Sequence, residues 1–487
     1  MKVSLITLGC DKNTVDSERY LAALADRGAV PTADMADADV IVVNTCGFID
    51  AAKQESIDAI VEAGRYKATG RARAVVAVGC MVQRHKAELE EALPEVDFFL
   101  GTTEIDRLVP ELEARGLIDD VPVPHPGVRL FTGDMPHVRY LKVSEGCDHG
   151  CAFCAIPLMR GKHRSFALGD VVREAQLLEA QGAREINLVA QDLAHWGRDV
   201  RDGNGLPELL EALLRETSIP WIRMLYLYAT GMTPRLLEVM AREPRIVPYL
   251  DMPMQHAADA VLARMRRPER QRTIRDRLAR VRAAVPDVAI RTTCIVGFPG
   301  ESDADFATLL AFLEEAQFDR VGVFTYSAQE GTRAFDMADD VPDAVKRERL
   351  ERVTELQRMI TAERYERHIG RTVPAMVDRI EADGTVQART VWQADDIDGV
   401  TRIPPPAAGI PHPASRIPHP ASRIPHPSSR TSHPEPGTIL DVRIDDVVDD
   451  YDFEATMVGV REAMPAVAPV RTRALPVMAA TVGSFGR

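Results

Sequence analysis

The stretch SEGCDHGCAFCAIP, residues 144–157, holds three cysteines within eight positions: Cys147, Cys151 and Cys154. Three is an unusual number, because a disulfide uses two cysteines and a closed structural zinc site uses four ligands. Thiolates are soft ligands that suit iron–sulfur clusters and zinc. A four-iron cluster held by three thiolates keeps one iron open to bind a substrate. The stretch predicts such a cluster, and zinc with His149 or His163 as a further ligand is the alternative.

The sequence around this loop predicts an open or partial (β/α) barrel over residues 136–367. Short apolar runs alternate with helical patterns about six times, and the expected strands are VRYLKVS, REINLVAQ, WIRMLYLY, PYLDMPMQ, AIRTTCIVGF and RVGVFTYSA. Such barrels carry their chemistry at the carboxyl ends of the strands. The loop with three cysteines follows the first strand, so it is placed for chemistry. Gln191 and Gln255 also follow strands and could face a cofactor or cap the sheet, whereas Cys294 lies within a strand and is expected in the core.

A second set of three cysteines precedes the barrel. Residues 1–135 contain the β-branched runs KVSLITLG, ADVIVVNT and RAVVAVG, which are typical of an open parallel sheet buried on both faces. Each run is followed closely by a cysteine: Cys10, Cys46 and Cys80. The carboxyl ends of parallel strands share one edge, where ligands bind. Three free core cysteines are the alternative, because Cys is often buried, but their common position favours a shared ligand.

Beyond the barrel, residues 368–457 contain short strand patterns that predict a small β-barrel. An insert at 402–436 carries a seven-residue Pro/His repeat, IPHPASR, which we expect to be a solvated loop rather than a metal site. Its evenly spaced histidines are His412, His419, His426 and His433. Residues 458–487 have the composition of a disordered tail.

Composition narrows the class of protein. The chain has 487 residues with 45% apolar and 27% charged residues, which is typical of soluble chains with two to four domains. No run approaches the ~18 apolar residues that a membrane span needs. TLGC at residues 7–10 looks like a lipoprotein box, but the apolar run before it is too short for a signal peptide. We therefore expect a cytoplasmic protein without membrane contact, whose seven cysteines are metal ligands or catalytic groups rather than disulfides.

The loop CDHGCAFC resembles the signature of the radical S-adenosylmethionine (SAM) enzymes. In that superfamily the open iron binds SAM, and the reduced cluster splits SAM to release a deoxyadenosyl radical. Phe153 resembles an aromatic residue common in that loop. TCIVGFPGES, with Gly297 and Gly300, resembles a glycine-containing strand that contacts SAM, although an ordinary βα turn would have the same pattern.

The whole arrangement resembles the methylthiotransferases, which combine an N-terminal domain, a radical SAM barrel and a small TRAM-like β-barrel. The resemblance covers about residues 1–400 and 437–457. It implies two 4Fe–4S clusters, with Cys10, Cys46 and Cys80 holding the second. It also implies that SAM is used twice, to methylate a sulfur and to make the radical, and that an electron donor such as flavodoxin or ferredoxin is needed. A radical suits an unactivated C–H bond, whose proton acid–base groups cannot remove near neutral pH.

Two branches of that family differ in substrate. GCDKNTVDSE and NTCGFIDAAKQESID resemble the branch that modifies an aspartate of small-subunit ribosomal protein S-twelve, and the transfer RNA branch is the alternative. Over 368–401 and 437–457, four arginines stand against thirteen acidic residues, a balance of minus nine. Such a domain would repel RNA phosphates and attract a basic protein, although acidic charge also serves solubility. Scattered arginines in the insert and tail leave contact with ribosomal RNA open.

A non-catalytic iron–sulfur protein, such as an electron carrier or redox sensor, is the alternative of another class. It predicts fully ligated clusters. Neither set of three cysteines has an evident fourth cysteine, so the sequence favours the enzyme.

Overall fold

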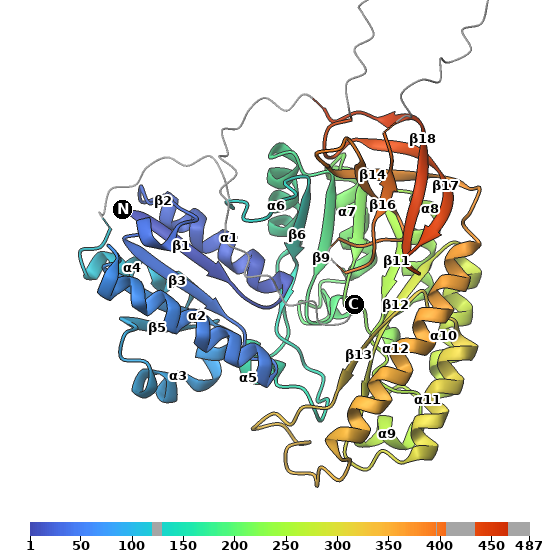
Figure 1. Ribbon diagram of the computed structural model, residues 1–487, viewed down its shortest axis with the longest axis horizontal. Coiled ribbons are helices and arrows are strands. Elements are labelled where there is room, and N and C mark those ends of the chain that lie inside the picture. The colour runs from blue at the N-terminus through green and yellow to red at the C-terminus, as the bar shows by residue number, and fades with distance from the viewer. Residues whose placement is uncertain (119–128, 396, 406–433, 466–487) are drawn as a thin grey trace, which may run out of the picture. The chain divides into compact units, whose positions relative to one another are not determined.

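The computed structural model describes residues 1–118, 129–395, 397–405 and 434–465, shown as coloured ribbons in Figure 1. The described chain divides into two units, one ending at Thr361 and the other beginning at Ala362. The first unit contains two parallel sheets, and the second contains a closed β-barrel. The predicted fold class, with an N-terminal parallel sheet, a central partial barrel and a terminal β-barrel, is confirmed. No helix among the described residues is long and apolar enough to cross a membrane.

The N-terminal sheet is parallel, with strand order β2-β1-β3-β4-β5. Its strands are β1 (Lys2–Thr7), β2 (Val30–Pro31), β3 (Val40–Thr45), β4 (Ala74–Gly79) and β5 (Phe98–Gly101). Its helices are α1 (Asp11–Ala25), α2 (Asp50–Thr69), α3 (Cys80–Ala92) and α4 (Leu108–Ala114), with 3₁₀ turns at Met35–Asp37 and Ile105–Arg107.

Both faces of this sheet are covered, which explains its continuous apolar runs. Along β3, Val40 and Val42 pack with α1 and α4, whereas Ile41 and Val43 pack with α2 and α3. Alternate residues of one strand therefore serve two cores, and neither face of the strand can be polar.

The central sheet has six parallel strands in the order β13-β12-β11-β10-β9-β6. They are β6 (Val138–Lys142), β9 (Glu185–Val189), β10 (Trp221–Met224), β11 (Ile246–Asp251), β12 (Ala289–Val296) and β13 (Arg320–Thr325). The helices are α5 (Ile156–Arg160), α6 (Leu168–Ala180), α7 (Leu206–Glu216), α8 (Pro234–Arg242), α9 (Asp259–Arg264), α10 (Gln271–Ala284), α11 (Asp303–Ala316) and α12 (Asp343–Glu366). A short pair, β7 (Ser144–Glu145) and β8 (Arg164–Ser165), flanks the cysteine loop, and 3₁₀ turns lie at Leu193–His195 and Ala229–Gly231.

The first strand of this sheet, β6, lies at one edge and the last, β13, at the other, so the six strands form an open arc rather than a closed eight-stranded barrel. Helices α10, α11 and α12 line the outer side of the arc in Figure 1. Ion pairs from Arg275 to Glu315 and from Arg349 to Asp303 join these helices. All six predicted strands are present.

The second unit closes in the order β14-β15-β16-β18-β17. Its strands are β14 (Thr372–Ile380), β15 (Val386–Thr390), β16 (Thr401–Ile403), β17 (Ile439–Val448) and β18 (Asp452–Glu462). The interior holds a buried ion pair between Arg389 and Asp378. Strand β16 enters the segment 402–436, which was expected to be a loop. Strand β18 runs to Glu462, into the segment 458–487, which was expected to be a tail. The predictions for the His repeat and for the last residues fall on 406–433 and 466–487, outside the described residues.

Candidate functional site

The three N-terminal cysteines lie at one edge of their sheet. Thr7 pairs with Asn44 and Thr45 pairs with Gly79, so β1, β3 and β4 end side by side. Cys46 directly follows β3, and Cys80 is the first residue of α3. Gly9 has φ +92°, and a Cβ built there would lie 2.9 Å from the Cys46 sulfur. Only glycine lets the chain before Cys10 approach Cys46 so closely.

Asn13 fixes the arrangement of these strand ends. Its side-chain nitrogen donates to the carbonyl oxygens of Leu8 at 2.7 Å and Thr45 at 3.1 Å. Its side-chain oxygen lies 3.7 Å from the Cys80 sulfur. One buried amide therefore joins the ends of β1 and β3 to the first residue of α3. Sequence reasoning did not find Asn13, although its place three residues after Cys10 at a helix start is a usable signal.

The second set of thiols lies in the loop after β6. Hydrogen bonds hold this loop: Cys147 N–H donates to Gly161 O at 3.1 Å, and Ala152 N–H donates to Met265 O at 2.9 Å. Cys147 is buried, whereas Cys151 and Cys154 are half-buried. All seven cysteines of the chain are free thiols. Cys294 is fully buried in the core, as expected.

The Cys151 sulfur has polar and cationic neighbours. The Tyr228 hydroxyl lies 2.9 Å from it, and an Arg267 nitrogen lies 3.8 Å away. The Arg267 guanidinium also lies 4.0 Å from the centre of the Tyr228 ring. These groups would stabilise negative charge on the sulfur, the form in which cysteine binds metal. Neither residue was found from the sequence, because both lie far from Cys151 along the chain.

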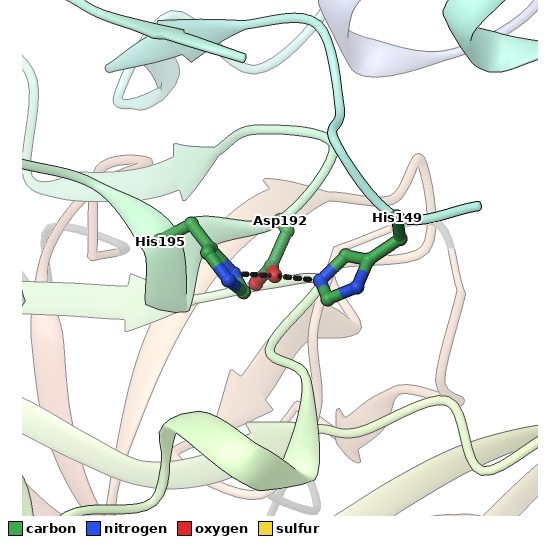
Figure 2. A group of neighbouring side chains, drawn as sticks. All are labelled: His149, Asp192 and His195. Carbon is green, nitrogen blue, oxygen red and sulfur yellow. Dashed lines mark hydrogen bonds and ion pairs between the residues drawn. The ribbon is translucent and has the colours of Figure 1, made fainter. Parts of the chain in front are cut away.

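Beside this loop, His149, Asp192 and His195 form a compact group, shown in Figure 2. The Asp192 carboxylate faces His149 Nε2 at 2.7 Å and His195 Nδ1. Although burial raises the pKa of Asp192, the hydrogen bonds from both histidines outweigh it and hold that pKa well below its usual range.

This group meets the spacing of a metal site, but its contacts favour hydrogen bonds. Arg198 Nη1 lies 2.7 Å from His195 Nε2. Because arginine only donates, His195 Nε2 accepts, which leaves the ring proton on Nδ1, facing Asp192. His149 stacks on Tyr228 with ring centres 3.7 Å apart. Asp192 therefore orients His149 against the tyrosine that contacts Cys151.

The zinc alternative for the cysteine loop is not supported by these positions. His149 is used by Asp192, and His163 Nε2 lies 3.1 Å from the Ser165 hydroxyl. Among the described residues, the group of His, Cys, Asp and Glu ligand atoms within 4.8 Å of one another contains no cysteine. Ligands of a single zinc ion must be that close, whereas ligands of a four-iron cluster bind different irons and can lie farther apart.

Gln191 and Gln255 each have a buried side-chain oxygen without a hydrogen-bond partner among the described residues. Gln191 Nε2 donates to Glu145 Oε1 at 2.9 Å, and Glu145 is two residues before Cys147. A buried amide oxygen without a partner is costly, so an absent ligand is a natural partner for each.

Phe153, Gly297 and Gly300 have structural explanations. Phe153 packs edge to face on Phe298, with ring centres 6.5 Å apart. Gly297 and Gly300 have positive φ, and a Cβ on Gly297 would clash with the Lys346 side chain. Gly300 N–H donates to Asp340 at 2.7 Å. These contacts fit the turn reading, and a role toward SAM stays a prediction.

Comparison with known proteins shows the family of this chain. Residues 2–101 match a family described as uncharacterized protein family UPF0004, and residues 141–313 match the radical SAM superfamily. The ribosomal protein uS12 methylthiotransferase RimO of Anaeromyxobacter sp. (strain K) is 47% identical over 411 residues, covering 82% of this chain and 87% of that one. The RimO protein of Syntrophotalea carbinolica is 43% identical over 409 residues, covering 82% and 90%. The chain belongs to the RimO family of methylthiotransferases.

Solved structures support the fold. The radical SAM methyltransferase TsrM of Kitasatospora setae, solved with cobalamin and a [4Fe-4S] cluster, matches with a TM-score of 0.50 and 14% identity, covering 68% of this chain and 76% of that one. The chain is thus a radical SAM methylthiotransferase of the RimO family, and the cofactors this implies are SAM and 4Fe–4S clusters. The donor set fits: free thiols lie at both sheet edges, three at each.

The burial of the thiols predicts how this RimO-family protein reacts with iodoacetamide before iron is added. Burial raises the pKa of Cys46 to about 12 and that of Cys80 to about 11, whereas Cys10 is exposed. Because the thiolate reacts, Cys10 should be labelled at least about tenfold faster at pH 8. Labelling of the two buried thiols should then rise about tenfold per pH unit, since pH 7–10 lies below their pKa values. Mass spectrometry of labelled peptides measures this.

Cys294 is the internal control for that labelling. It is fully buried and should stay unlabelled at every pH that leaves the chain folded. Loading with iron and sulfide should protect the six other cysteines. Equal labelling of Cys10 and Cys46 would contradict the difference in burial. No protection by iron would contradict the assignment of the six cysteines as cluster ligands.

Proposed function

We propose that this protein adds a methylthio group to the β-carbon of an aspartate in small-subunit ribosomal protein uS12. The observation that carries the proposal is the presence, in one chain, of two separate groups of three free thiols at the carboxyl edges of two parallel sheets. The names of relatives 41–47% identical support the choice of substrate. The transfer RNA alternative has no comparable support among them.

Each group of thiols has its own part. Cys147, Cys151 and Cys154 would hold the cluster that binds SAM, and Cys10, Cys46 and Cys80 would hold the second cluster. When bound, the two clusters and SAM would supply a radical that removes hydrogen from an unactivated carbon, together with the sulfur and the methyl group of the product.

Other residues of the chain would orient SAM and the Cys151 sulfur and exclude water. The unpartnered side-chain oxygens of Gln191 and Gln255 are placed to accept hydrogen bonds from SAM. Phe153, Gly297 and Gly300 would line the same site, with Phe153 and Phe298 keeping water from the loop. Tyr228, Arg267 and Asp192 keep the Cys151 sulfur oriented.

The second unit would recognise the substrate protein. Its acidic balance favours a basic protein over RNA. We further propose that the protein acts in the cytoplasm, on uS12 alone or within the ribosomal subunit. An electron donor such as flavodoxin or ferredoxin would reduce the clusters.

The test is a reaction under anaerobic conditions. The chain is reconstituted with iron and sulfide, then incubated with SAM, a reductant and either purified uS12 or bulk transfer RNA. Mass spectrometry should show the methylthio mass on one aspartate of uS12 and none on RNA. The same mass on RNA alone would refute the substrate. Reconstituted clusters that never cleave SAM would instead favour the electron carrier or redox sensor.

A further inference from the structure

Arg160 joins the two thiol sites of the chain. It is the last residue of α5, the short helix that follows the loop carrying Cys147, Cys151 and Cys154. Its side chain is only 2% exposed. Its Nε lies 3.2 Å from the sulfur of Cys80, a cysteine of the N-terminal domain. Arg160 therefore follows one group of cysteines in the chain, and its side chain contacts a sulfur of the other group.

The helix that carries Arg160 packs on the same sulfur site. Cys80, Ala155 and Met159 form one buried apolar cluster, with Ile156 against it. The Thr102 hydroxyl of the N-terminal domain donates to the Met159 carbonyl at 2.5 Å. The guanidinium is therefore held next to Cys80 by its own backbone as well as by its charge.

The remaining nitrogens of Arg160 are anchored by acids from both domains. Nη1 lies 2.7 Å from Asp16 and 3.1 Å from Glu145. Nη2 donates to the Asn13 oxygen, the same atom that faces Cys80. Lys142 pairs with both acids, which brings a second buried cation to this network. Asp16 and Glu145 thus balance the charges of Arg160 and Lys142. The Nε of Arg160 is left to donate to the Cys80 sulfur.

The network extends to the other site. Glu145, which accepts from Arg160, also accepts from Gln191 Nε2 at 2.9 Å. A continuous path of contacts thus runs from Cys80 through Arg160 and Glu145 to Gln191, at the carboxyl edge of the central sheet.

We propose that Arg160 is a positioning residue for the N-terminal iron–sulfur site, donating from Nε to the Cys80 sulfur and tying that sulfur, through Glu145, to the radical SAM domain. This rests on the proposed function, which makes Cys80 a cluster ligand. A donated hydrogen bond and a fixed positive charge stabilise a thiolate and the reduced form of its cluster. Arg160 therefore raises the reduction potential of that cluster and slows its loss of iron.

The experiment isolates the N-terminal site in the full chain. The background chain has Cys147, Cys151 and Cys154 replaced by alanine. It is reconstituted anaerobically and compared with two variants of itself that also carry Arg160→Gln or Arg160→Lys. Iron content, the chelator concentration that removes half of the iron, and the reduction potential followed by electron paramagnetic resonance are measured. Both variants should lose iron at about tenfold lower chelator concentration and have a more negative potential.

Two comparisons separate positioning from mere stability. Arg160→Lys keeps the charge among Asp16 and Glu145, so the iron-free chain should unfold near the parent temperature even if Arg160→Gln does not. Arg19→Gln is the matched control, because Arg19 pairs with Glu174 at 2.9 Å across the same two domains. It should lose the ion pair and leave the chelator midpoint and potential unchanged.

Two results would overturn the proposal, in distinguishable ways. If the background chain binds iron but both Arg160 variants match Arg19→Gln, Arg160 is only a structural ion pair. If the background chain itself binds no iron, the assignment of Cys10, Cys46 and Cys80 as cluster ligands is wrong, and the role of Arg160 falls with it.

Discussion

Replacing Cys10 with alanine should abolish methylthio transfer to uS12 while deoxyadenosine is still produced from SAM. Cys10 follows β1 at the edge of the N-terminal sheet, whereas Cys147, Cys151 and Cys154 lie in the loop after β6 of the central sheet. Replacing Cys151 should abolish both products, because its loop would hold SAM. Chromatography for deoxyadenosine and mass spectrometry of uS12 measure the two losses separately.

Cys294→Ala is the matched control for these changes. Cys294 is fully buried in the core of the central sheet and belongs to neither thiol group. Its replacement should keep both products, at the stability cost of a small buried side chain, about 1 kcal/mol. Equal loss of deoxyadenosine and methylthio transfer in Cys10→Ala would refute the division of labour between the two groups.

The sequence predicts both sheet edges because their signal is local. Each buried run of β-branched residues reads as a parallel strand, and the residue after it must lie at the carboxyl edge. Cys46 and Cys80 follow their strands without a gap, so topology alone brings them together. Cys10 lies three residues beyond β1, and Gly9 makes the required close approach.

The contacts that orient the thiols could not be predicted in the same way. Arg160 and Cys80 are 80 positions apart, and Tyr228 and Cys151 are 77 apart. Arginine at the end of a short helix and tyrosine after a strand are common in any chain, so neither carries a local signal. Their role follows only from the packing of one domain on the other and of one strand-end loop on another.

The terminal barrel shows a second limit. Strand β16 has three residues, too few for a strand pattern, and β18 carries exposed apolar residues where a buried face would be expected. Both are held by neighbours: β16 pairs with β15 and β18, and β18 pairs along most of β17. Barrel closure determines these strands, and closure is not visible in a short window of sequence.

The β17–β18 hairpin of this barrel has features of a binding surface. Asp446 lies directly opposite Glu454, and like charges in that position destabilise a sheet. Asp449 lies in the turn between the strands. Val458, which follows on β18, is 61% exposed. An exposed acidic hairpin with an apolar strand suits a basic protein partner, which would relieve the repulsion on binding.

Reversing three of these charges, with Asp446→Lys, Asp449→Lys and Glu454→Lys together, should lower kcat/KM for uS12 by about 10- to 100-fold, because attraction of a basic substrate becomes repulsion. The turnover at saturating uS12 should change little. The loss should shrink as salt is added, since exposed charges are screened over about 10 Å at 0.1 M. Initial rates at several salt concentrations, with deoxyadenosine formation without substrate as the basal activity, measure this.

The matched control changes the same amount of charge elsewhere. Glu62, Glu90 and Glu91 are exposed on α2 and α3 of the N-terminal domain, and lysine at all three gives the same gain of positive charge. If the attraction is local to the hairpin, this control should keep most of its kcat/KM for uS12. An equal fall in both triple variants would mean that uS12 responds only to the net charge of −14. No fall in the hairpin variant would mean that the barrel does not bind the substrate through these acids.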